Sequence, residues 1–162
     1  MIDPAQDIFP DNVIKTLMPY MGALDNDIIV VNRPLRSTDA NHMIGVFSTL
    51  WTPEQDSYEI GHSAPDEPTC QNYQIGVQGL VKHGDEPKGL SIHYILAAMI
   101  RRVLYKNQQL RNDISQLVVT DSGSTESFRK LTVRLQRLMN NEVQGQFVFV
   151  STAEVLIETE IT

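Results

Sequence analysis

Four histidines and one cysteine are the side chains in this sequence best suited to hold a metal ion or attack a substrate. His83 and His93 are the closest histidine pair, with Asp85 and Glu86 between them. Their spacing matches no common metal-binding motif, so we interpret these histidines as surface or capping residues. Cys70 stands alone in a polar stretch, which excludes an intrachain disulfide and predicts an inert thiol.

The usual catalytic motifs are absent from the sequence: there is no G-x-S-x-G elbow, Walker loop, H-E-x-x-H or G-x-G-x-x-G. Most carboxylate pairs, such as Asp25 with Asp27, lie in turn-like segments where solvation explains them. Glu154, Glu158 and Glu160 differ, because they share one face of a strand pattern. That face either meets solvent, or contacts a protein partner or an aqueous passage. We therefore predict no enzyme activity, no metal and no cofactor.

The net charge of −7 over 162 residues argues against tight nucleic-acid binding, which needs clustered Lys and Arg. No apolar run is long enough to span a bilayer. The first residues contain neither a basic stretch nor an apolar one, so no secretory signal is predicted and the cytoplasm is the expected place of synthesis.

Two helices are expected to support whatever site exists. Residues 9–21 have an amphipathic pattern in which Pro19 should kink or remove the last turn. Residues 90–106 carry a broad apolar stripe that includes Ile92, Ile95, Leu96 and Ile100, with basic residues in the last turns.

Strands are predicted at residues 28–31, 43–51, 72–83 and 116–120 from β-branched or alternating patterns. Within the third of these, Gly76 and Gly79 should mark a bulge or close packing. Residues 52–71 lack periodicity, which is unusual inside a compact domain and indicates a functional or mobile loop. Trp51, Tyr58 and Tyr73 bracket this loop, where they could equally anchor an interface or pack the loop.

The final third predicts a long hairpin. Residues 129–138 fit a strand or a helix, but the alternation from residue 147 onward favours pairing with a strand, across a turn at residues 140–146. This pairing would place Leu131, Val133 and Leu135 beside Phe149, Ser151 and Ala153. It would also bring Arg134 and Lys130 near Glu154 and Glu158. The sequence thus predicts one α+β domain over residues 1–162. Its mixed, mainly antiparallel sheet should have about four to six strands, with one main helix and a short N-terminal helix on one face.

Five segments, in order along the chain, resemble the tail terminator proteins of long-tailed, non-contractile phages. They are VVNRP at 30–34, YQIGVQ at 73–78, RRVLY at 101–105, VRLQR at 133–137 and NEVQGQFVFVST at 141–152, the last running on to residue 160. The resemblance covers the chain from about residue 9 onward, and no feature of the family maps onto residues 52–71.

Membership of that family implies a homohexameric ring in the virion, at the head-proximal end of the tail, assembled in the host cytoplasm. The ring stops polymerisation of the tail tube protein and offers a docking surface to the head–tail connector or stopper protein. DNA passes through its lumen without tight binding. A ring subunit presents two different patches to its neighbours. The candidate interface residues are Arg33, Arg36, Trp51, Tyr58, Asn140, Asn141, Glu142, Gln144, Glu154 and Glu158.

Two other classes stay open. One is a different neck or tail completion protein of phages, which would be distinguished by its place in the particle. The other is a small metal-dependent nuclease, which would be distinguished by cleavage of DNA by the purified protein.

Overall fold

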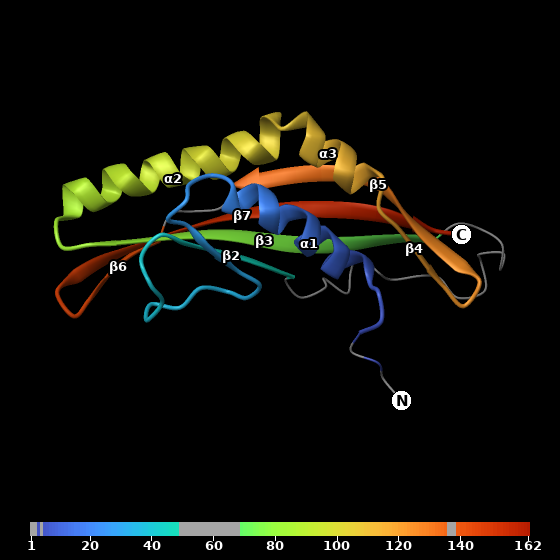
Figure 1. Ribbon diagram of the computed structural model, residues 1–162, viewed down its shortest axis with the longest axis horizontal. Coiled ribbons are helices and arrows are strands. Elements are labelled where there is room, and N and C mark those ends of the chain that lie inside the picture. Colours follow the sequence, from blue (N-terminus) through green and yellow to red (C-terminus); the bar gives the residue numbers. More distant parts are fainter. Residues whose placement is uncertain (1–2, 4, 49–68, 136–138) are drawn as a thin grey trace.

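The computed structural model describes residue 3 and residues 5–48, 69–135 and 139–162, and the chain in these segments forms three helices and seven strands (Figure 1). The helices are α1 (Phe9–Gly22), α2 (Glu86–Lys106) and α3 (Gln108–Ser115). The strands are β1 (Ile29–Val31), β2 (Met43–Ser48), β3 (Thr69–His83), β4 (Val118–Asp121), β5 (Ser124–Leu135), β6 (Met139–Val143) and β7 (Gln146–Ile161).

All seven strands belong to one sheet, in the order β1-β2-β3-β7-β5-β4, with β6 also paired to β7. Among the described strands, only the β1–β2 pair is parallel. The α+β class and the mainly antiparallel sheet are therefore confirmed. The described part of the chain has seven strands because β6 includes residues 140–143, which we expected in a turn.

The two longest strands, β3 and β7, pair over their whole length at the centre of the sheet. On its other side β7 pairs first with β6 and then with β5. The predicted proximity of these charges is confirmed, because Arg134 lies opposite Glu154 and Lys130 opposite Glu158. Glu158, however, forms its ion pair with Arg129. The apolar partners predicted for Leu131 and Val133 are wrong. These residues lie opposite Ile157 and Val155, and not beside Phe149 and Ser151, whereas Leu135 lies opposite Ala153 as predicted.

Helix α2 begins earlier than predicted, because Asp85 caps it: the Asp85 carboxylate accepts a hydrogen bond from the Lys88 N–H at 3.1 Å. Helix α1 continues through Pro19 to Gly22, and the Ala23 N–H donates to the Pro19 carbonyl at 3.0 Å. Of the two outcomes predicted for Pro19, a kink or the loss of the last turn, the loss is thus wrong.

Helix α3 was not predicted at all. Asn107 ends α2 and also starts α3, since its side-chain oxygen accepts from the Leu110 N–H at 3.0 Å. The Tyr20 hydroxyl hydrogen bonds to Asp113 and ties α3 to α1.

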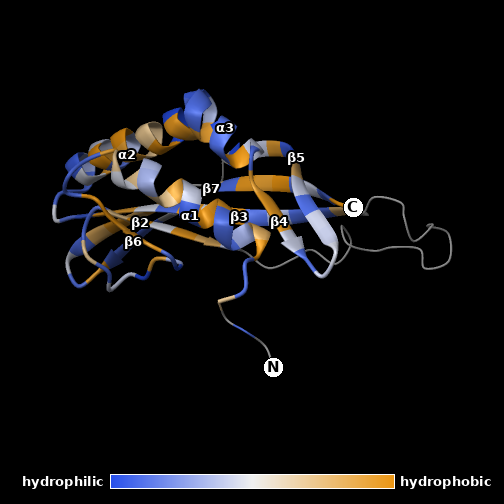
Figure 2. Cartoon of the chain, turned by 45° about the vertical axis from the view of Figure 1, so that its right-hand side comes forward, coloured by the Kyte–Doolittle hydropathy of each residue, from blue (hydrophilic) through white to orange (hydrophobic). Residues whose placement is uncertain are grey.

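One core joins the three helices to a single face of the sheet, and Figure 2 shows polar and apolar residues alternating along α2 and α3. From the strands, the core receives side chains such as Ile44, Ile75, Val77, Val155 and Ile157. The main helix approaches the sheet closely over Gly79, as predicted: a Cβ there would lie 3.1 Å from Leu96 and from Ile100.

Ile95, expected in the apolar stripe that faces the core, is 61% exposed. In the described part of the chain, no helix is both long enough and apolar enough to span a membrane.

Candidate protein interfaces

The acidic face predicted on the last strand does not consist of free carboxylates. Glu154 is only 8% exposed and accepts a hydrogen bond from Arg134 Nε at 3.0 Å. Glu158 pairs with Arg129 Nε at 3.2 Å. Both ion pairs join β7 to β5 on the face of the sheet away from the helices. They hold neighbouring strands of one subunit together, so we do not count Glu154 and Glu158 as interface residues.

The segment between β1 and β2, which contains Arg33 and Arg36, is held in place by one aspartate. Arg33 donates two hydrogen bonds to Asp39, at 2.8 and 2.7 Å, and the Arg36 N–H donates a third at 2.6 Å. These bonds, Arg33 first, lower the pKa of Asp39 to about 2. Arg33 is therefore occupied within its own loop, whereas the Arg36 side chain remains at the surface.

The hairpin that joins β6 to β7 supplies four of the predicted interface residues, and all four are exposed: Asn140, Asn141, Glu142 and Gln144. Gln144 and Gly145 have φ values of 53° and 78°, the positive values that a two-residue hairpin turn requires. Asn140 also donates to Glu86 of α2 at 3.4 Å, which steadies the hairpin against the start of the main helix. This hairpin remains a candidate surface.

Trp51, Tyr58 and most of the expected loop at residues 52–71 lie outside the described residues. The end of that loop was placed too late, because residues 69–71 already belong to β3. Cys70 consequently lies in a strand, opposite Glu160, and not in a loop.

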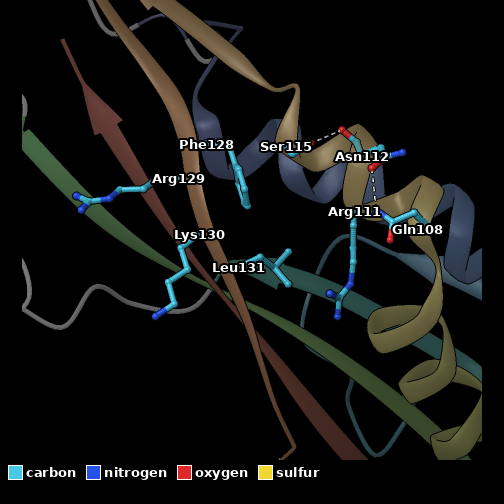
Figure 3. A pocket seen from close by; sticks show the side chains of 8 residues that line it. All are labelled: Gln108, Arg111, Asn112, Ser115, Phe128, Arg129, Lys130 and Leu131. Atoms are coloured by element: carbon cyan, nitrogen blue, oxygen red, sulfur yellow. Dashed lines mark hydrogen bonds between the residues drawn. The ribbon is translucent and has the colours of Figure 1, made fainter.

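A groove of about 290 Å³ runs between α3 and β5 (Figure 3), and we call it the basic groove. Phe128 and Leu131 point from the strand toward the helix, and Arg111 hangs from α3 on the opposite side. The remaining lining residues are Gln108, Asn112, Ser115, Arg129 and Lys130. Figure 3 shows the side chains of Arg129 and Lys130 pointing away from α3, so the groove combines an apolar floor with an amide-rich helix side and one cation, Arg111.

The strand beside this groove is partly unpaired. Its neighbour β4 pairs with β5 only as far as Ser127, and no other described strand pairs with that side of β5. A bulge between Phe128 and Lys130 shifts the register there. Such bulges are common at sheet edges, where they interrupt regular pairing. The groove thus follows a free strand edge.

A second hollow, of about 180 Å³, lies between the α1–β1 turn and α2, and we call it the acidic hollow. Asp25 and Asp27 stand at this hollow, and both are exposed. The apolar residues that line it are Ile28, Ile92, Ile95, Leu96 and Met99. Close by in the chain, Ile29 is 52% exposed. An exposed apolar area beside charged residues is a typical feature of protein interfaces.

The two hollows differ in charge because basic residues are concentrated in one part of the chain. Residues 101–134 contain seven Lys or Arg and three Asp or Glu, a net charge of +4, although the whole chain carries −7. This segment runs from the end of α2 through α3 to β5.

The predicted histidine pair does not come together as a metal site. His83 accepts a hydrogen bond from the Asp85 N–H at 2.8 Å, in agreement with the capping role predicted for it. His93 was wrongly placed at the surface: it is fully buried and stacks on Phe149, with ring centroids 5.9 Å apart. Burial lowers the pKa of His93 to about 4. Among the described residues, no three His, Cys, Asp or Glu side chains form a group that could hold a metal ion.

Sequence reasoning missed the basic groove because it missed α3. A signal was present, since Asn107 can cap a helix in which Leu110 and Ile114 share a face. Both are buried, and they orient the polar side of α3, including Arg111, away from the core.

Comparison with known proteins adds little to this picture. No family model matches the chain. No curated protein matches it. One of the solved structures that match aligns with a TM-score of 0.49 and 12% identical residues, over 99% of this chain and 97% of the other. At this identity and score, the match assigns neither a family nor a function.

Proposed function

We propose that this protein is a tail terminator of a long-tailed, non-contractile phage. As a ring on the head-proximal end of the tail tube, it would stop tube polymerisation and dock the head–tail connector. The observation that supports this most is the order of the resembling segments. They fall successively at β1, in β3, at the end of α2, at the end of β5 and through the β6–β7 hairpin.

The surface of the subunit is suited to a ring. A closed ring joins identical subunits head to tail, so each must present two different surfaces. The basic groove lies at the β5 end of the sheet, and the acidic hollow lies beside β1 at the opposite end. The β6–β7 hairpin, with its exposed polar residues, is a third surface, available to the tube or the connector.

The charge of the subunit also suits a ring through which DNA must slide. A net charge of −7 per subunit disfavours the long-lived phosphate contacts that would hold a passing duplex. We therefore expect duplex DNA to pass through the lumen without tight binding.

Depletion of the protein during phage assembly tests the proposal. A phage that lacks its terminator should produce overlong tail tubes and heads without tails, and supply of the protein from a plasmid should restore tails of normal length. Electron microscopy of lysates measures both outcomes. Tails of normal length attached to heads in the absence of the protein would refute the capping role.

Antibody labelling of intact virions separates the terminator from other neck or tail completion proteins. Label at the junction of tube and neck agrees with the proposal. Label inside the head, or at the distal tip of the tail, contradicts it.

A further inference from the structure

The main helix and the start of the next one carry charges of a single sign. Residues 87–112 contain five Lys or Arg and no Asp or Glu, although the whole chain carries −7. Exposed faces of helices usually contain both signs, because opposite charges three or four residues apart stabilise the helix. The cations of α2 therefore lack the acidic neighbours that would normally pair with them on the same helix.

The same helix also concentrates exposed apolar and aromatic side chains. Six large hydrophobic side chains are exposed in the described part of the chain, and three of them belong to α2: Tyr94 at 58%, Ile95 at 61% and Tyr105 at 39%. Eleven residues are about three helical turns, so Tyr94 and Tyr105 lie on one side of α2. Figures 1 and 2 show no described element over the side of α2 that faces away from the sheet. Apolar side chains that cluster at an uncovered surface mark interaction sites.

A hollow of about 300 Å³ lies on this side of the helix, lined by Ala98, Arg101, Arg102, Tyr105 and Lys106. None of its three cations forms an ion pair with another described residue. The hydroxyl of Tyr105 donates to the Val133 carbonyl at 3.3 Å, which fixes the ring at this surface. We call Tyr94, Ile95, Arg101, Arg102, Tyr105 and Lys106 the α2 patch.

We propose that the α2 patch is a docking surface for an acidic segment of a partner protein. Carboxylates of the partner would pair with the cations at residues 101–106, and apolar side chains of the partner would cover Tyr94 and Ile95. Asp25 and Asp27 stand beside Ile95 at the acidic hollow, so the carboxylates of the partner must lie at the other end of the patch. The inference goes beyond the terminator role and does not depend on it.

A protein fits this surface better than a nucleic acid does. Contacts to phosphates would use the cations but would leave Ile95 uncovered, and the net charge of −7 repels a polyanion as long as DNA. Tyrosine and arginine are the residues enriched in the buried centres of protein interfaces. The dipole of α2 explains cations near its end, such as Lys106, but it explains neither exposed Tyr94 nor exposed Ile95.

Binding of simple acidic polymers to the whole protein tests the inference. The probes are a random copolymer of glutamate and tyrosine, polyglutamate, and duplex DNA, compared at equal concentrations of negative charge and low salt. Titration of ¹⁵N-labelled protein, followed by NMR, measures the affinity and locates the contact. The copolymer should shift amide signals mainly at residues 94–106, and it should bind several-fold more tightly than polyglutamate because only the copolymer has side chains that cover apolar surface.

Two variants separate the charged part of the patch from its apolar part. Arg101→Gln with Arg102→Gln should bind both acidic polymers at least about tenfold more weakly. Tyr94→Gln with Ile95→Gln should weaken binding of the copolymer and leave binding of polyglutamate nearly unchanged. Glutamine preserves the helix in each case, because its helix propensity is high.

Each variant has a matched control elsewhere on the surface. Lys15→Gln with Arg36→Gln removes the same charge at two exposed positions. Ile8→Gln with Val118→Gln removes two other exposed apolar side chains, which are 46% and 56% exposed. Both controls should bind the copolymer nearly as well as the natural protein does.

Four results would overturn the inference. The first is failure of the copolymer to bind, or shifts confined to residues outside α2. The second is an equal loss of affinity in a variant and its control. The third is tighter binding of duplex DNA than of the copolymer at the patch, which would make it a nucleic-acid contact. The fourth is self-association of the natural protein, measured by sedimentation, that the patch variants abolish, because the partner would then be a second copy of this chain.

Discussion

Val155→Ala should remove a large part of the stability of the sheet. Val155 is fully buried at the middle of β7, between Ile75 of β3 and Val133 of β5. The substitution deletes two buried methyl groups, at about 0.8 kcal/mol each. Both neighbouring strands are held by their own hydrogen bonds, so they cannot move to fill the cavity that the substitution leaves. The cavity raises the expected loss in the free energy of unfolding to about 2–3 kcal/mol.

Urea unfolding followed by circular dichroism measures this loss, with Val118→Ala as the matched control. Val118 is a strand residue of the same type, but it lies in β4 at the edge of the sheet and is 56% exposed. The control should change the free energy of unfolding by less than about 0.5 kcal/mol. Equal losses in the two variants, or a loss below about 1 kcal/mol in Val155→Ala, would refute the assignment of β7 as the centre of the core.

Three further predictions concern polar groups. As pH falls from about 6.5 to about 4, His93 takes up a proton in the unfolded state but not in the folded state. The free energy of unfolding should therefore drop by up to roughly 3 kcal/mol. If the urea midpoint of His93→Leu falls as steeply over this pH range, the prediction is wrong. Glu126→Ala should lower the free energy of unfolding by about 1–3 kcal/mol, because Glu126 accepts hydrogen bonds from Tyr73 and from the buried hydroxyl of Thr159. If this variant unfolds thermally at the same midpoint as the natural protein, solvent replaces these bonds and the prediction is wrong. Arg134→Ala should cost about 1 kcal/mol, because the arginine of this ion pair is largely exposed, and Arg134→Lys should recover part of it in the same unfolding assay.

The central strands could be predicted because their patterns reflect burial on one face. Alternation in β3 and β7 follows from helices that cover only the side of Ile75, Val77, Val155 and Ile157. The pairing of Arg134 with Glu154 could be predicted because opposite charges on adjacent strands agree with that alternation. The apolar pairs were less specific, since several registers bring one apolar residue beside another.

The elements that were missed depend on contacts distant in sequence. Residues 108–115 contain only two buried apolar side chains, Leu110 and Ile114. The helix is stabilised because both side chains pack into the core. Residues 139–143 resemble a turn, but they find a ladder partner in β7. The basic groove required both α3 and the bulge in β5, so its residues could not be grouped from sequence spacing alone.

Strand β7 lies between β3 on one side and β5 and β6 on the other, yet it is the last of the seven strands to emerge from a ribosome. During synthesis, β3 and β5 therefore have no partner at the centre of the sheet until residues 146–161 appear. A nascent chain would leave an edge of each strand unpaired throughout that interval, which favours aggregation. For the same reason, a truncation that removes residues 146–161 would remove the middle of the sheet and not its edge.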